Sequence, residues 1–285
     1  MSEVIQSKSK INYSYSTIKI TQSRIDKGLI AIPVSLAEWF PEHNATIQVS
    51  LDDSDVLQTK NYASYRSATR ECRIGGMAEW FNKNKIKDGN EIVVQLVDKE
   101  NFIYKLIPEH KFLLKTQELQ KSFDASEDET EASEQIIKLS QWTDLDEQKV
   151  AFNEYRRLID TVKVEERRSV KRPSSRARES VPYNLRVLLG NIYQGHCQVC
   201  DFWFLKQDNN PYFETHHTDP SLGSNPKNII LVCANCHRQF EYANVHPERN
   251  KEGWLIMVSF NERTYSVNQV VLKTAFEDFF KKLFV

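Results

Sequence analysis

The N-terminal part of the chain carries short apolar runs separated by turn-forming residues. Runs in which β-branched or aromatic residues alternate with polar ones are typical of strands. Four such runs stand out, at 29–34, 46–51, 91–97 and 102–107. A compact helix is expected at WFNKNK (80–85), shortly after the Gly75-Gly76 pair. Together these elements predict a small β barrel.

The middle of the chain changes to a helical periodicity. A connecting helix is expected over 134–162, because apolar residues recur there at the spacing of one helix face. That face comprises Ala151, Tyr155, Leu158 and Val162. The preceding segment 124–134 (DASEDETEASE) is acidic and poor in apolar residues, which favours a flexible spacer.

Shorter elements follow in the C-terminal part. A strand is expected after Pro211 through ETHH, a second strand at 228–232 (NIILV), and a helix beginning at 233–243. The runs 254–260 and 264–267 predict a hairpin. A last helix would carry an apolar stripe of Leu272, Phe276, Phe279, Phe280 and Leu283. Such a stripe packs into a core or forms a dimer interface.

Length and composition fit two globular domains of α+β class. The chain has 285 residues, of which 40% are hydrophobic and 11% aromatic. The elements predict a barrel domain at 1–112, a spacer and linker helix at 113–162, and a C-terminal domain at 163–285. The chain opens with a polar run and has no apolar stretch near the ~18 residues of a membrane span. A cytoplasmic protein without membrane association is therefore expected.

Two CxxC pairs, Cys197/Cys200 and Cys233/Cys236, give the strongest chemical signal. Each CxxC turn delivers two sulfurs to one ion, so two turns make a closed structural zinc site. The alternatives are two disulfides or four unrelated thiols, and the expected reducing compartment disfavours disulfides. The fifth cysteine, Cys72, is expected to be a plain thiol.

Three histidines accompany these cysteines. His216 and His217 lie on the first predicted strand, and His237 directly follows the last cysteine. Phosphodiester hydrolysis needs a base that is neutral near pH 7 and a cation that offsets charge on the phosphate. The alternative is that the paired histidines are further zinc ligands or surface residues. Glu214 would share a face with His216. It would there bind the metal directly, contact a metal ligand, or remain a solvated carboxylate.

From about 183 to 245 the chain resembles the HNH nuclease family, whose fold is the ββα-metal fold. The resemblance is carried by the CxxC pairs, the paired His216-His217, Asn228 and His237. It implies that His217 is the general base, that Asn228 holds the loop and orients this base, and that His216 and His237 bind one divalent ion. Many members have Asp at the position of His216. Because two imidazoles suit Mn²⁺ and similar ions better than Mg²⁺, the metal preference stays open.

A second resemblance, over about 15–108, is to the plant B-three DNA-binding pseudobarrel, which also occurs in bacterial restriction enzymes. It is carried by IAIPVSLAEWFP, NYASYR and GGMAEWFNKNKIKDGNEIVV. In that family two arms grip the major groove, and the matching segments here are 23–28 and 60–73. The implied DNA-binding residues are Ser23, Arg24, Lys27, Lys60, Tyr62, Tyr65, Arg66, Arg70 and Arg73. The alternative is an ordinary charged loop on a barrel.

Charge adds little for the whole chain, since 38 basic residues face 39 acidic ones, a net charge of −1. The segment 163–178 is basic, as either a phosphate-binding run or a solvated linker. The expected function is a restriction-type endonuclease that cuts double-stranded DNA as a homodimer, with structural Zn²⁺ and catalytic Mn²⁺, Mg²⁺ or another divalent ion. The alternatives are an HNH enzyme that depends on modified cytosine and a non-catalytic DNA-binding zinc regulator.

Overall fold

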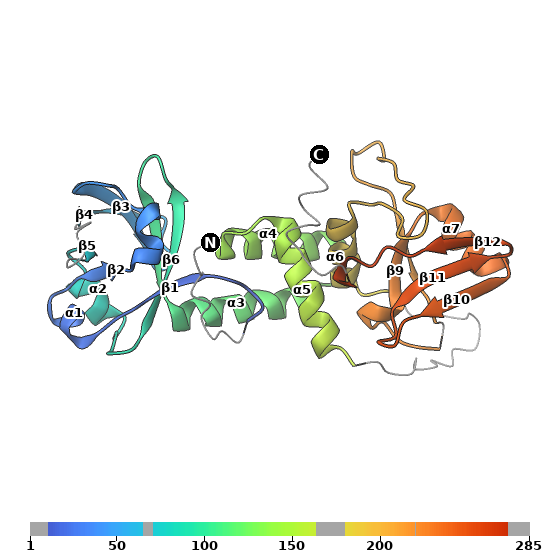
Figure 1. The fold of residues 1–285 in the computed structure, drawn as a ribbon, viewed down its shortest axis with the longest axis horizontal. Helices are drawn as coiled ribbons and strands as arrows, with labels where there is room; N and C mark the ends of the chain where they lie inside the picture. Colours follow the sequence, from blue (N-terminus) through green and yellow to red (C-terminus); the bar gives the residue numbers. More distant parts are fainter. Residues whose placement is uncertain (1–10, 65–70, 164–179, 220, 273–285) are drawn as a thin grey trace. The chain divides into compact units, whose positions relative to one another are not determined.

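The computed structural model describes residues 11–64, 71–163, 180–219 and 221–272 (Figure 1). The chain divides into two compact units. Unit 1 comprises Met1–Lys121 and Gln141–Asp144, and unit 2 comprises Ser122–Ser140 and Leu145–Val285. None of the helices in the described ranges combines the length and the apolar character needed to cross a membrane.

Unit 1 is built on one seven-stranded sheet with the order β1-β6-β7-β3-β4-β5-β2. Its strands are β1 Ser16–Lys19, β2 Ile30–Ile32, β3 Ala45–Leu51, β4 Leu57–Ala63, β5 Cys72–Ile74, β6 Glu91–Asp98 and β7 Ile103–Pro108. The β3/β7 pair is parallel and the other pairs are antiparallel. The two edge strands, β1 and β2, come into contact, so the sheet curls into a nearly closed barrel. The expected pseudobarrel is thereby confirmed.

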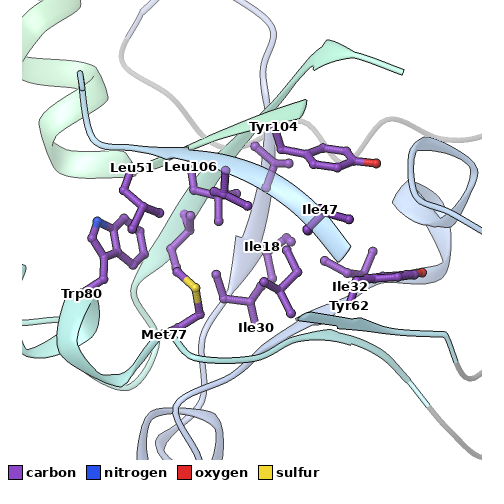
Figure 2. Close-up of a cluster of buried hydrophobic side chains, with 14 of the residues drawn as sticks. Ile18, Ile30, Ile32, Ile47, Leu51, Tyr62, Met77, Trp80, Tyr104 and Leu106 are labelled. Atoms are coloured by element: carbon purple, nitrogen blue, oxygen red, sulfur yellow. The ribbon is translucent and has the colours of Figure 1, made fainter. Parts of the chain in front are cut away.

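The barrel closes around one apolar core (Figure 2). Along β3, Ile47, Val49 and Leu51 alternate inward, as the pleat of a strand requires. Met77 and Trp80 enter the core at the short helix α2 (Ala78–Lys83). Two further short helices, α1 (Gln22–Asp26) and η1 (Val34–Trp39), belong to the same unit. Burying each of the large side chains stabilises the barrel by about 1.5–3 kcal/mol.

Three of the seven strands of this sheet, β1, β4 and β5, are not predicted by the hydrophobic pattern of the sequence. β1 and β5 are only 4 and 3 residues long, too short for a periodic signal. β4 reads LQTKNYA, and only its Tyr62 is buried. Hydrophobic patterning therefore misses β1 and β5 because they are short, although Ile18 and Ile74 lie in the core, and it misses β4 because that strand is mostly exposed.

The central helices differ from the expectation of a flexible spacer followed by one connecting helix. The structure has α3 (Glu109–Asp124), α4 (Glu129–Thr143) and α5 (Glu147–Thr161), so most of the acidic segment is helical. The Asp128 carboxylate accepts a hydrogen bond from the Glu131 backbone N–H, which caps the start of α4. Asp144, at φ 58°, breaks the connecting helix, and Asp146 then caps α5 through Lys149 N–H.

Unit 2 holds the elements that follow. They are α6 Tyr183–Tyr193, β8 Glu214–His217, η2 Pro226–Asn228, β9 Ile229–Val232, α7 Ala234–Tyr242, β10 Val245–Arg249, β11 Leu255–Phe260, β12 Arg263–Ser266 and η3 Val270–Leu272. β8 pairs with β9, and β10–β12 form a separate antiparallel sheet in which the expected β11/β12 hairpin is confirmed (Figure 1). Beyond Leu272, the expected terminal helix lies outside the described residues, as does most of the basic run at 163–178.

Candidate active site and metal centre

Four cysteine sulfurs gather at the start of α7. Cys197 and Cys200 lie in the turn that follows α6, Cys233 is the N-cap of α7, and Cys236 lies in its first turn. All four Sγ atoms lie within 4.8 Å of one another, and those of Cys200 and Cys233 are 3.7 Å apart. A tetrahedral zinc ion with Zn–S bonds of about 2.3 Å needs sulfurs about 3.8 Å apart. The cluster therefore fits a closed zinc site.

The pKa values of these thiols also favour a metal site. A hydrogen bond with Cys236 lowers the pKa of Cys197 to about 5, while the same pairing raises the pKa of Cys236. Burial raises the pKa of Cys200 to about 11. One thiolate thus suppresses ionisation of its neighbours, and a divalent cation would allow all four sulfurs to bind as thiolates.

The β8/β9 hairpin and α7 bring the three histidines together. Neighbouring strand residues face opposite sides, so Glu214 and His216 share one face of β8 and His217 lies on the other. The His216 ring stacks on Phe240 of α7 with centroids 4.2 Å apart, and it lies 5.2 Å from the His237 ring. Strand β8 and helix α7 therefore present two imidazoles side by side.

Glu214 connects His237 to the hairpin. One carboxylate oxygen, Oε2, pairs with His237 Nδ1, and the other accepts a hydrogen bond from the Tyr212 hydroxyl. Burial alone would raise the pKa of Glu214, but the hydrogen bonds with Tyr212 and His237 lower it overall. Metal-binding histidines commonly donate their second ring N–H to a carboxylate. The pairing leaves His237 Nε2 as the nitrogen that can bind an ion.

His217 lies against the loop that joins the two strands. Its Nε2 atom is 3.1 Å from Ser224 Oγ. Asn228, only 2% exposed, holds this loop: its Oδ1 accepts hydrogen bonds from Thr218 Oγ1 and Asp219 N–H. Its Nδ2 donates to the backbone carbonyls of Asp219, Leu222 and Gly223. Asn228 thus fixes the loop segment that contacts His217.

The three histidines line one cleft of about 720 Å³ in unit 2. Arg186 from α6 also lines it, with a guanidinium that pairs with Glu129 at 2.6 Å and approaches Thr215 Oγ1 at 3.4 Å. The cleft therefore combines imidazole groups with a cation at its wall. Such a combination suits an anionic phosphodiester.

In unit 1, the two segments expected to contact DNA lie next to each other. Arg24 of α1 forms an ion pair with Glu71, beside β5, with N–O distances of 2.8 and 2.9 Å. Ser23 and Lys27, which lie in the same short segment as Arg24, are exposed, and Arg73 lies two residues after Glu71 on β5. Lys60 on β4 donates to the Gly76 carbonyl at 2.8 Å. Basic side chains from both segments thus share one region of the barrel.

Tyr62 is a correction to the expected DNA-binding set. Its side chain is 2% exposed and its ring stacks on Phe40 with centroids 5.5 Å apart. Tyr62 alternates inward on β4, so it contributes to the core and cannot reach a ligand on the surface. Tyr65, Arg66 and Arg70 lie outside the described residues.

Sequence analysis missed several residues around the histidines. Tyr212, Ser224, Phe240 and Arg249 carry no motif, and the structure alone reveals their contacts with Glu214, His217, His216 and Thr218 respectively. The position of Phe240 offered a signal, because it lies three residues after His237 on α7 and residues at that spacing share one helix face. No signal in the sequence indicated the contact between Ser224 and His217.

One comparison with known proteins matches the segment that contains the cysteines and the three histidines. The family model described as HNH endonuclease matches residues 197–241. No curated protein matches the chain.

Partial likenesses to solved structures involve about a third of the chain. The Arabidopsis FUS3-DNA complex is 13% identical, with 32% of this chain and 92% of that chain covered and a TM-score of 0.28. The Arabidopsis thaliana transcription factor LEC2-DNA complex is 14% identical (32% and 88% covered, TM-score 0.28). The N-terminal domain of Helicobacter pylori LlaJI.R1 is 15% identical (32% and 78% covered, TM-score 0.25).

The family match spans both cysteine pairs, the β8/β9 hairpin and nearly all of α7. It therefore includes the zinc-type cluster, the three histidines and Asn228. Residues 197–241 are thus the part of the chain that is similar to HNH endonucleases.

Proposed function

We propose that this protein is a restriction-type DNA endonuclease that hydrolyses phosphodiester bonds of double-stranded DNA. The observation that carries the proposal is the convergence of His216, His217 and His237 on one cleft within the segment that matches the HNH family. Unit 1 is proposed to choose the site and unit 2 to cut the backbone.

In this proposal His217 is the general base. An imidazole, whose ordinary pKa is about 6.5, is largely neutral at pH 7 and can take a proton from water. The contact between His217 Nε2 and Ser224 Oγ would orient the imidazole ring, which would then receive a proton from the attacking water. Water attack at phosphorus, with departure of the 3′ oxygen, leaves a 5′-phosphate and a 3′-hydroxyl.

His216 and His237 are proposed to hold the catalytic ion. The pairing of Glu214 with His237 Nδ1 supports this role, because it fixes the ring and leaves Nε2 for a metal. When bound, a divalent ion would offset the charge that develops on the phosphate and the leaving oxygen. In this proposal Glu214 is a positioning residue behind His237.

For unit 1, the proposal rests on the sequence resemblance and on the exposed basic residues near the Arg24–Glu71 pair. An arginine there can grip guanine through two hydrogen bonds, and the lysines can neutralise phosphates. Cutting both strands at one locus needs two active sites, so a homodimer on DNA is part of the proposal.

The proposal is tested by incubating the full chain with matched plasmids, one methylated at cytosine and one not, with Mg²⁺ or Mn²⁺. We expect discrete linear fragments from at least one plasmid, with 5′-phosphate ends. A His217→Ala protein of equal zinc content serves as the control and should leave both plasmids supercoiled. If the unsubstituted protein cleaves neither plasmid with either ion, or if His217→Ala cleaves equally well, the proposal is wrong.

A further inference from the structure

Four consecutive large apolar residues are exposed shortly after the first cysteine pair. This aromatic loop, residues 202–205, comprises Phe202, Trp203, Phe204 and Leu205, which are 56%, 46%, 43% and 50% exposed. Contiguous apolar surface of this kind is uncommon on soluble proteins and marks a contact site. The proposed cleavage chemistry makes no use of these side chains.

The aromatic loop is held in place at both ends. The Phe202 carbonyl accepts a hydrogen bond from Cys197 N–H at 3.1 Å, and the Phe204 carbonyl accepts one from Tyr212 N–H at 3.0 Å. Leu205 and Pro211 form a β-bridge. The loop is therefore tied to the cysteine cluster on one side and to the strand leading into β8 on the other.

Two rings of the loop are already ordered by stacking. Trp203 stacks on His196 and Phe204 stacks on Tyr212, in each case with centroids 5.0 Å apart. Because the rings are fixed in the free protein, little side-chain entropy would be lost when another flat group packs on their exposed parts.

The loop also adjoins the active site. Tyr212, beneath Phe204, donates its hydroxyl to Glu214, which pairs with His237. Both Arg186 and Arg238 interact electrostatically with Tyr212. Phe204 thus lies three residue contacts from His237, through Tyr212 and Glu214, and the two guanidinium groups act on the same tyrosine. This arrangement combines a base-stacking surface with phosphate-attracting charge.

We propose that the aromatic loop stacks against bases of the DNA strand bound in the cleft, as a wedge beside the cut. The inference rests on the proposed nuclease function and deepens it. Size favours a base over a second copy of the chain: a stable protein interface takes roughly 20–30 residues from each partner, whereas one exposed ring is enough to stack a base. The residues that follow the loop, from Lys206 to Asn210, are polar.

The test compares DNA with and without bases. In a His217→Ala background, which should leave the DNA intact, the affinity of the full chain is measured for a single-stranded oligonucleotide and for an abasic strand of equal length. We expect tighter binding to the strand that has bases. Trp203→Ala/Phe204→Ala should weaken that binding at least about fivefold and leave the abasic strand unaffected. The salt dependence should not change, because the phosphate contacts remain.

Tyr242→Ala is the matched control, since it removes an aromatic ring that is 80% exposed on α7 of the same unit. Trp203→Phe, which keeps a flat ring, should retain most of the preference for bases. Equal affinity of the double variant and its parent for the base-containing strand would overturn the inference, as would equal losses on both strands. Conversion of a dimer to a monomer with base preference retained would assign the loop to a second copy instead. Cleavage of plasmid by the unsubstituted protein tests the nuclease proposal separately.

Discussion

Replacing Asn228 by alanine should uncouple the loop from the hairpin and slow cleavage. The Asn228 side chain accepts two hydrogen bonds and donates to three backbone carbonyls, at distances of 2.8 to 3.3 Å. Its two N–H groups allow two full donated bonds, so four bonds count. At about 1 kcal/mol each, and with some carbonyls rehydrated in the variant, Asn228→Ala should lower the free energy of unfolding by about 3 kcal/mol.

Loss of stability alone would not distinguish a positioning residue from a structural one. Ser224 contacts His217 from the loop that Asn228 holds, so we expect kcat to fall at least about tenfold at a temperature where the variant is fully folded, with KM nearly unchanged. Urea unfolding gives the stability, and cleavage of a saturating plasmid substrate gives kcat.

Asn225→Ala is the control for this variant. Asn225 is 3% exposed and caps η2 through Lys227 N–H, without a hydrogen bond to residues 218–224 among those observed. Its Nδ2 also donates to the Val162 carbonyl at 2.5 Å. With two side-chain hydrogen bonds lost, Asn225→Ala should lower stability by about 2 kcal/mol and leave kcat close to that of the unsubstituted protein. If Asn228→Ala is destabilised but cleaves at the unsubstituted rate, the loop does not position His217.

Five further substitutions test the roles proposed for the histidines, the cysteine cluster and the Arg24–Glu71 pair. His217→Ala should keep zinc content, melting temperature and DNA binding while cleavage is lost; loss of zinc would rule out its role as a base. Cys233→Ser should unfold unit 2, because a structural zinc site contributes on the order of 10 kcal/mol, and zinc analysis with circular dichroism checks this. His216→Asp should shift the ion preference of cleavage from Mn²⁺ toward Mg²⁺, since a carboxylate supplies the hard oxygen ligand; an unchanged preference would exclude His216 as a ligand. Glu71→Ala should strengthen DNA binding and Arg24→Ala should weaken it, with little change in stability, and equal affinities in a gel-shift assay would contradict a DNA-binding role for Arg24.

The sequence was most informative where spacing itself fixes the chemistry. Two CxxC pairs can bring four sulfurs to one ion only in a narrow set of folds, so the cluster of Cys197, Cys200, Cys233 and Cys236 followed from the motif. The barrel followed from alternating apolar residues in the strands that face its core. Glu214 could not be assigned, because its role depends on the Tyr212 hydroxyl and the His237 ring, which reach it only through the tertiary fold.

Patterning failed where a residue type has two common environments. Tyr62 stands among basic residues in a polar strand, which favours a surface ring, but the pleat of β4 directs it into the core beside Phe40. The acidic segment 124–134 has the composition of a spacer, yet the Asp128 cap and the ion pair between Glu129 and Arg186 support a helix there. Local composition cannot reveal partners that are distant in the chain.

The cysteine cluster and the histidines are structurally coupled through helix α7. Helix α7 has nine residues and the strands β8 and β9 have four each, lengths at which neither an isolated helix nor a two-stranded hairpin is stable in water. Cys233 caps α7, Cys236 lies in its first turn, and His237 is the next residue, so an ion that ties these sulfurs to Cys197 and Cys200 also fixes the start of the helix that carries His237. The pairing of Glu214 with His237 then links α7 to strand β8, which also carries His216. A closed zinc site that takes no part in the reaction would thus set the geometry of an open one that does, because both sit on the same short helix.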